Sequence, residues 1–215
     1  MAGIRLKNDE LNVVSYDKYF GEMDISEEEK EKRKQLAKEL EDAFFIMFYL
    51  LTDSDIESVY KYIQEKYCEI CRKYISSKET PTYIVTYSAY ITKQIIDSVK
   101  ENFVYNADTC RLKSMNIAAN EANVIGNYIN QKDAVRHGFK YKVWKTKEDK
   151  KVRHTHVKVD GKKIGIFDSF KVGNSEMMFP KDYSLGAHPE EIVNCRCVVK
   201  YERSKSCQYG GFSFL

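Results

Sequence analysis

The feature that most constrains the fold is a change in the period of the apolar residues at Gly138. Before this glycine, apolar side chains recur every three or four residues, which is the spacing of amphipathic helices. After it, Phe139, Tyr141 and Val143 alternate with lysines, which is the two-residue period of a half-buried strand. The sequence therefore predicts an α+β fold in which a helical region precedes a small α+β module with short antiparallel strands.

The helical region is expected to contain about four helices. The first follows Ser26, because Glu29 completes a capping box and three consecutive glutamates lie at the positive end of the helix dipole. A second helix follows the polar capping segment 52–55, a third follows Pro81, and a fourth ends at Gly138 as its C-terminal glycine. Their apolar stripes run over 36–51, 56–74, 84–103 and 112–129.

The same pattern divides the chain into four segments. These are an N-terminal arm at 1–25, a helical domain at 26–137, a C-terminal α+β module at 138–203 and a tail at 204–215. Inside the module, further strands are expected at 163–167 and 197–201. A long irregular stretch separates them, and a loop of that length inside a compact domain usually needs an anchor or a function.

Composition places the chain among globular proteins. With 43% apolar and 31% charged residues, it is too apolar for a disordered protein and too charged for a membrane bundle. The longest apolar stretch, 43–51, is less than half of the about 20 residues that a membrane-spanning helix needs. The first residues lack the apolar segment of a secretory signal. We therefore expect an intracellular protein with no membrane partner.

Positive charge is concentrated in one part of the chain. The net charge is only +3, but residues 132–163 contain twelve basic and four acidic residues, a net of +8. Such an asymmetry is typical of a module that contacts a polyanion, and it also occurs on the solvated faces of ordinary domains. The lysines that would contact double-stranded DNA are Lys140, Lys142, Lys145, Lys147, Lys150 and Lys151.

Two histidines and two cysteines of the module are candidate zinc ligands. His154, His156, Cys195 and Cys197 are of the residue types that zinc binds, and a small module with a long loop gains stability from a metal. One residue separates the members of each pair, which is closer than the usual spacing of zinc ligands. The alternative is that both cysteines pack as small apolar residues on one face of an edge strand, while the histidines form local hydrogen bonds. No other cofactor is indicated.

The same part of the chain can be interpreted as an active site. His156 would act as a general base, Asp160 would orient it, and Arg153 and Arg196 would stabilise an oxyanion or a phosphate, as in a nuclease or a group transferase. However, Asp160-Gly161 is also a strong turn signal, and the sequence does not show that these groups converge. The chain has no glycine-rich phosphate loop and no serine-hydrolase or zinc-protease motif. The balance favours a protein that is not an enzyme.

The motifs of the module follow one another in a recognisable order. An aromatic strand that ends in Trp is followed by an Asp, an Arg-x-x-His and an Asp-Gly, and then by a Phe/Pro-rich loop that ends in Asn-Cys-Arg-Cys. These residues are Trp144, Asp149, Arg153, His156, Asp160, Gly161, Phe179, Pro180, Asp182, Asn194, Cys195, Arg196 and Cys197. This order resembles the C-terminal domain of the phage Mu F-like minor head proteins, also called phage head morphogenesis proteins.

The resemblance implies a minor component of a tailed-phage or prophage head. Such a protein would be made in the host cytoplasm and packaged in the virion head, with the portal, other head proteins and double-stranded DNA as its partners. We expect Phe44, Phe45 and Phe48 to form an exposed patch that meets one of these protein partners. Family modules of this kind also occur joined to toxin domains, so an enzyme that acts on nucleic acid or protein is the alternative.

Two departures from the family pattern bear on the module. Many relatives carry a Cys-x-x-Cys where this chain has Arg153 and His156. The resemblance therefore implies that the loop is braced in both cases, by a metal site in those relatives and by hydrogen bonds here. The helix before the first strand often carries Arg-Thr-Glu in the family, and only Glu121 of this motif is present.

Overall fold

The computed structural model describes residues 15–75, 80–99 and 105–204. It confirms the α+β fold, with a helical region followed by small antiparallel sheets and short helices. The helices of the first part are α1 (Tyr16–Gly21), α2 (Glu27–Asp53), α3 (Ile56–Tyr74), α4 (Thr82–Val99) and α5 (Ala107–Arg136). The module then contains β1 (Tyr141–Lys145), α6 (His154–Val157), β2 (Lys163–Gly165), β3 (Phe170–Val172), β4 (Ser175–Met177), α7 (Pro189–Ile192) and β5 (Val198–Glu202).

Local capping explains where the long helices begin and end. The Oγ atom of Ser26 accepts a hydrogen bond from the backbone N of Glu29 at 3.2 Å, and α2 begins at the next residue after Ser26. Asp55 caps α3 in the same way, through the backbone N of Ser58 at 2.9 Å. At the far end of α5, Gly138 has a φ of 73°, which is the left-handed conformation that ends helices.

Part of the segment expected to be an arm is a helix. α1 places Tyr16, Tyr19 and Phe20 in the core, and the hydroxyl of Tyr16 donates to Glu41 of α2 at 2.6 Å. A six-residue helix is too short to show a hydrophobic period in the sequence. Contact with the surface of α2 decides which residues of α1 are buried. The first fourteen residues of the expected arm, and residues 205–215 of the expected tail, lie outside the described residues.

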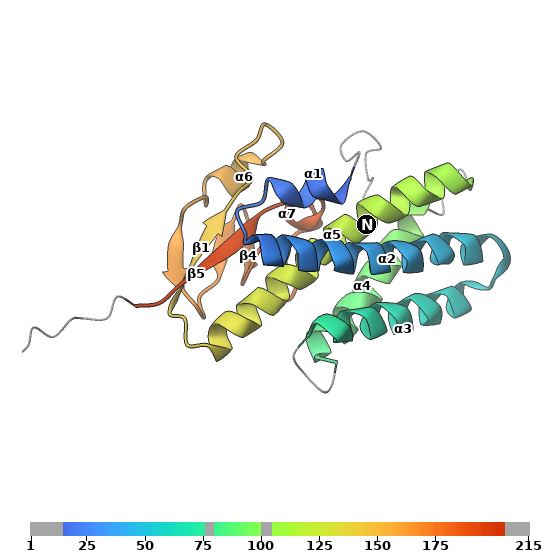
Figure 1. Ribbon diagram of the computed structural model, residues 1–215, viewed down its shortest axis with the longest axis horizontal. Helices are drawn as coiled ribbons and strands as arrows, with labels where there is room; N and C mark the ends of the chain where they lie inside the picture. The colour runs from blue at the N-terminus through green and yellow to red at the C-terminus, as the bar shows by residue number, and fades with distance from the viewer. Residues whose placement is uncertain (1–14, 76–79, 100–104, 205–215) are drawn as a thin grey trace, which may run out of the picture.

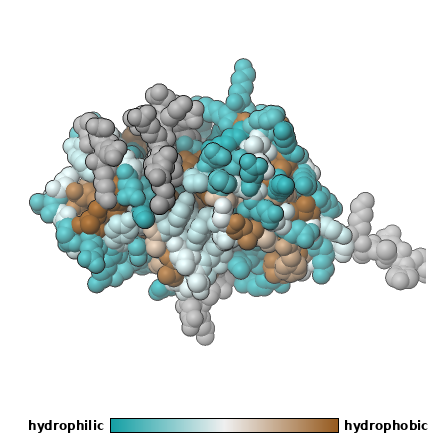
Figure 2. All heavy atoms as spheres, turned by 180° about the vertical axis from the view of Figure 1, so that it is seen from behind, coloured by the Kyte–Doolittle hydropathy of each residue, from teal (hydrophilic) through white to brown (hydrophobic). Residues whose placement is uncertain are grey.

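The expected exposed phenylalanine patch does not exist. Phe44 and Phe48 are fully buried, and the ring of Phe44 lies 6.4 Å from that of Tyr67 in α3. Phe45 is half-buried, with the guanidinium of Arg111 over its ring at 5.5 Å. The reason is that α2 is covered by α1, α3 and α5 together, so its apolar face is wider than one stripe. Seen from behind, apolar atoms gather only in small separate groups on a largely hydrophilic surface (Figure 2).

Helix α5 connects the two parts of the molecule. It crosses α2 and extends from the helical end to the sheets (Figure 1). One hydrophobic cluster includes Ala122 and Ile125 of α5 together with Trp144 and Val198 of the module. The 138–203 module thus shares its core with the helices, and the expected boundary at Gly138 marks a change from helix to strand.

Two small antiparallel sheets form the module. The larger one has the strand order β2-β1-β5, with Val143 opposite Lys163 and Trp144 opposite Val199. The smaller one is a β3-β4 hairpin that the sequence did not indicate. β1 begins at Tyr141, two residues later than the alternating pattern suggested. None of the helices in the described part of the chain combines the length and hydropathy needed to cross a bilayer.

Candidate functional site

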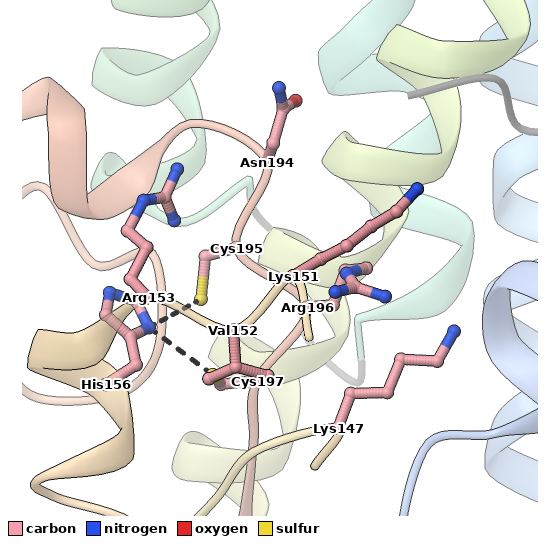
Figure 3. A pocket seen from close by; sticks show the side chains of 9 residues that line it. All are labelled: Lys147, Lys151, Val152, Arg153, His156, Asn194, Cys195, Arg196 and Cys197. Carbon is pink, nitrogen blue, oxygen red and sulfur yellow. Dashed lines mark hydrogen bonds between the residues drawn. The ribbon is translucent and has the colours of Figure 1, made fainter. Parts of the chain in front are cut away.

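Three segments of the module meet at the candidate site. The loop between β1 and α6 carries Asp149 and Arg153, α6 carries His156, and the segment between α7 and β5 carries 194–197. The side chains of His156, Cys195 and Cys197 point toward one another in its centre (Figure 3). The sequence motifs that precede and follow the long irregular stretch are therefore in contact, as the interpretation of a braced loop requires.

His156 is the centre of this arrangement. Its Nδ1 atom lies 3.4 Å from the sulfur of Cys197 and 3.5 Å from that of Cys195, and its Nε2 atom lies 3.0 Å from Oε2 of Glu191. The same Glu191 oxygen accepts a hydrogen bond from Thr155 at 2.8 Å. All three central side chains are no more than 3% exposed. Both nitrogens of the imidazole are therefore in use, and the residue is almost completely buried.

The electrostatics of the cluster are unusual for buried thiols. Burial opposes ionisation of Cys195, but hydrogen bonds from Cys197 and His156 outweigh it and hold the pKa of this thiol well below its ordinary value. The hydrogen bond to Cys195 and burial together raise the pKa of the Cys197 thiol. For His156, burial lowers the pKa, and the interaction with Cys195 more than offsets it and raises the pKa. The cluster thus favours one anionic sulfur beside a cationic imidazole.

Arginines fix the two segments on either side of the cluster. Arg196 donates two hydrogen bonds to the carboxylate of Asp149, one of them at 2.6 Å. The hydrogen bond from Arg196 lowers the pKa of the Asp149 carboxyl group. Arg153 donates to the backbone carbonyl oxygen of Val193. Each arginine therefore joins the β1–α6 loop to the α7–β5 segment.

Asp160 and Gly161 form the turn that their sequence predicted. The Oδ1 atom of Asp160 accepts a hydrogen bond from the backbone N of Thr146 at 2.7 Å, and Gly161 donates to the carbonyl of Trp144 at 2.9 Å. Gly161 has a φ of 70°, a conformation that favours glycine. The role of this pair is to connect the end of α6 to β1.

A row of amides on α5, missed by the sequence analysis, supports the site from below. Asn123 donates to the carbonyl oxygens of Cys195 and Cys197 at 3.3 and 3.4 Å, and Asn127 donates to those of Pro180 and Cys197 at 3.1 and 3.2 Å. These hydrogen bonds are buried, so the amides supply donors to carbonyl groups that are shielded from water. The complete row, spaced every three or four residues, is Asn120, Asn123, Asn127 and Gln131.

Arg33 of α2 holds two members of the amide row, Asn123 and Asn127, in place. Its guanidinium donates to the side-chain oxygens of Asn123 and Asn127 and also pairs with Glu29. With the oxygens occupied, the NH₂ groups of both asparagines must point to the module. Gly126 makes room for the arginine, because a Cβ atom there would lie 2.5 Å from its Nε atom. This brace joins residues 90 or more positions apart, which no local sequence signal reveals.

Lys181 and Glu121 form a second buried polar group beside the row. The ammonium of Lys181 donates to Oδ1 of Asn120 at 2.7 Å, while Glu121 accepts hydrogen bonds from Tyr67 and Tyr87 at 3.0 and 3.3 Å. Burial lowers the pKa of Lys181 to about 8, with the charge of Glu121 opposing this shift. Burial raises the pKa of Glu121, while Lys181 and both tyrosines oppose the rise. Glu121, the one residue of the Arg-Thr-Glu motif that is present in this chain, thus forms its hydrogen bonds in the protein interior.

The structure divides the six lysines assigned to DNA. Lys142 is completely buried, and its ammonium donates to the carbonyl of Met178 at 2.7 Å, so it cannot contact DNA. Lys147 is 6% exposed at its side chain and pairs with Glu22 at 2.9 Å. Lys145 is half-buried, and the exposed members are Lys140, Lys150 and Lys151. The assignment of Lys142 to the DNA contact, which followed from the alternating pattern, is wrong because β1 is covered on both faces.

His154 also lies outside the cluster. It is the exposed first residue of α6, whereas among the described residues the group able to hold a metal consists of His156, Cys195 and Cys197. A cavity of about 10 Å³ adjoins them, lined also by Lys147, Arg153 and Arg196. This is room for about one water molecule, far below the several hundred Å³ of ordinary substrate pockets.

The fold and the site together define a helical protein with a closed, internally braced α+β module. The chain belongs to the family described as Phage Mu protein F like protein, whose family model matches residues 31–200. The match extends from α2 to β5 and includes Arg33, the amide row and the whole His–Cys cluster. No curated protein and no solved structure matches the chain significantly.

Proposed function

We propose that this protein is a minor head protein that acts in head morphogenesis and DNA delivery, associated with the portal and located inside the virion head. The observation that carries this proposal is the family match over both the helical region and the braced module. The closed site agrees with this proposal, since a component of an assembled particle must keep its conformation when its partners bind, and the contacts of the closed site stabilise that conformation.

The proposal is tested by following the protein into particles. An amber mutation in its gene should give heads that lack the protein and have defects in assembly or infectivity, with recovery when the chain is supplied in trans. Mass spectrometry of purified virions should detect the chain in the wild-type particle. Absence from virions, with normal particle formation by the amber mutant, would contradict the proposal.

For the portal contact, we propose the end of the helical region where α2 turns into α3. Tyr49 is 72% exposed and Ile46 and Ile56 are each 44% exposed, so the two helices that meet at this turn present three apolar side chains to solvent. In co-expression with the portal protein of the same phage, Tyr49→Lys with Ile46→Lys should abolish co-purification. The matched control is Val85→Lys on α4, an exposed apolar position elsewhere, which should not. Equal retention of both variants would refute this surface.

For the DNA contact, the exposed lysines Lys140, Lys150 and Lys151 support a weak electrostatic interaction with phosphates. With about three contacts, affinity for a DNA duplex should fall roughly 40-fold between 50 and 200 mM salt. Fluorescence anisotropy at these salt concentrations measures the slope. The Lys150→Gln/Lys151→Gln double variant should lower this salt dependence by the equivalent of about two phosphate contacts. The Lys61→Gln/Lys171→Gln double variant should leave the salt dependence unchanged. A flat salt response of the wild-type protein would rule out the contact.

The geometry favours this structural role over the enzyme alternative. The three proposed catalytic groups bind three different partners: His156 contacts the thiols and Glu191, Asp160 accepts from Thr146, and Arg196 pairs with Asp149. The imidazole is 1% exposed. A general base must reach the proton it removes, and this one has no substrate-sized space beside it.

A further inference from the structure

We propose that His156, Cys195 and Cys197 bind one Zn²⁺ ion, with a water molecule as the fourth ligand. This proposal is independent of the role in the phage head. It concerns the point at which the β1–α6 loop, α6 and the α7–β5 segment meet (Figure 3). Thiolate and imidazole are the ligands that select zinc among the common divalent ions.

The distances between the ligand atoms fit a tetrahedral zinc ion. With zinc–sulfur and zinc–nitrogen bonds of about 2.3 and 2.0 Å, a tetrahedral angle places nitrogen and sulfur about 3.5 Å apart. The observed separations of Nδ1 of His156 from the two sulfurs are 3.4 and 3.5 Å. All three ligand atoms lie within 4.8 Å of one another. The two nitrogen–sulfur separations are therefore already those of a zinc site.

The close Cys-x-Cys spacing is no obstacle in this fold. Residues two apart in an extended segment project to the same side, and both sulfurs here face the same imidazole. The backbone between them is held by Asn123 and Asn127, which bind the carbonyl oxygens of Cys195 and Cys197. The two thiols are thus presented from a fixed segment, which reduces the entropy cost of closing the site.

Glu191 orients the histidine for metal binding. Its carboxylate lies 3.0 Å from Nε2 and is itself held by Thr155. If Nε2 donates to this carboxylate, the neutral imidazole carries its lone pair on Nδ1, the atom that faces both sulfurs. A carboxylate behind the ligating histidine is the usual outer support of zinc sites in proteins.

The fourth position and the charge balance are also provided. The cavity of about 10 Å³ beside the three ligands has room for about one water molecule. Arg153 and Arg196 line this cavity, and cationic neighbours stabilise the thiolate form of cysteine. On binding, the cluster of one imidazole and two cysteines releases two protons to solvent, which leaves a neutral imidazole and two thiolates that neutralise the ion. A buried neutral centre costs less than the separate charges would.

The primary experiment uses the full chain without an affinity tag, purified under reducing conditions without chelator. Elemental analysis should give about one zinc per chain. Replacement by Co²⁺ should produce the visible absorption of a tetrahedral site together with a thiolate-to-cobalt charge-transfer band. Stripping the metal with a chelator should make two further thiols reactive toward a thiol reagent.

Variants separate this site from adventitious binding. Cys195→Ser and Cys197→Ser should each lose the zinc, whereas Cys110→Ser, a change at a cysteine in α5, should keep it. Glu191→Gln should weaken zinc affinity by about 10- to 100-fold and still bind one ion at saturation. If a cysteine variant does not fold, the cobalt spectrum and the thiol count of the wild-type chain decide the matter.

Several outcomes would overturn the proposal. These are a wild-type chain that takes up no zinc when it is offered under reducing conditions, a cobalt spectrum without the thiolate band, or a zinc content unchanged in the Cys195→Ser/Cys197→Ser double variant. The last result would identify the metal as an adventitious ion only.

Discussion

The most exacting test of the brace between the helices and the module is Gly126→Ala. An added Cβ atom would lie 2.5 Å from Nε and 2.7 Å from Cζ of Arg33, so the guanidinium would have to move by about 1 Å to restore normal contact. Arg33 is 2% exposed and is held by Glu29, Asn123 and Asn127, so any movement breaks hydrogen bonds of a charged group.

The expected magnitude follows from two opposing effects. Overpacking and the weakened charged hydrogen bonds should cost about 3 kcal/mol, while replacing a glycine inside a helix by alanine gains about 1 kcal/mol. The free energy of unfolding should therefore fall by about 2 kcal/mol, which lowers the melting temperature of a chain of this size by about 4–8 °C. Urea denaturation followed by circular dichroism measures the change.

Two controls isolate the contact with Arg33. Gly21→Ala at the end of α1, where no atom lies within 4 Å of the new Cβ, should change stability by less than about 0.5 kcal/mol. In an Arg33→Ala background, Gly126→Ala should be neutral or stabilising, because the obstructing side chain is gone. A Gly126→Ala protein as stable as the wild type would refute the argument that this glycine exists to admit Arg33.

Three further predictions concern the polar interior. Asn127→Leu removes two donors to buried carbonyls and should lower the free energy of unfolding by about 2 kcal/mol in urea denaturation; no loss would show that other donors replace them. Burial lowers the pKa of Lys142 and of Lys181 to about 8, whereas a lysine side chain in the unfolded chain has a pKa of about 10.4. Between these two pKa values the unfolded chain binds more protons than the folded chain, so the free energy of unfolding should rise from pH 8 to 10. Lys142→Met should reduce that rise by about 2 kcal/mol. An identical pH dependence in the variant and the wild type would contradict this prediction. Asp149→Asn should cost about 1 kcal/mol at neutral pH, with the Lys158→Gln variant as a surface control in the same thermal assay.

Local signals in the sequence were sufficient for the long helices. The cap at Ser26 and the terminating Gly138 act within one helical turn, so their effect does not depend on distant residues. α1 was missed because its burial depends on α2, and the β3-β4 hairpin because strands of three residues show no alternation. The prediction of an exposed phenylalanine patch was wrong, because an apolar stripe in the sequence does not reveal how many helices pack around it.

For the candidate site, the sequence supplied the residue types but not their partners. Arg153, His156 and the 194–197 segment were singled out in advance, and the structure brings them together. The roles of Glu191 and Arg33 had no signal, since each contacts atoms far away along the chain. A row of amides in α5 was visible in principle, because Asn123, Asn127 and Gln131 recur at helical spacing in a stretch rich in apolar residues.

The sequence by itself determined the order of the four long helices, the change from helix to strand at Gly138 and the motif order of the Mu F-like module, because caps, turns and hydrophobic period are properties of neighbouring residues. Tertiary structure alone decided which polar side chains became interior. Lys142 was turned inward because its strand is covered on both faces, and the NH₂ groups of Asn123 and Asn127 were directed to the module because Arg33 occupied their oxygens. Such choices depend on satisfying buried donors and acceptors across long separations, and no local pattern encodes that balance.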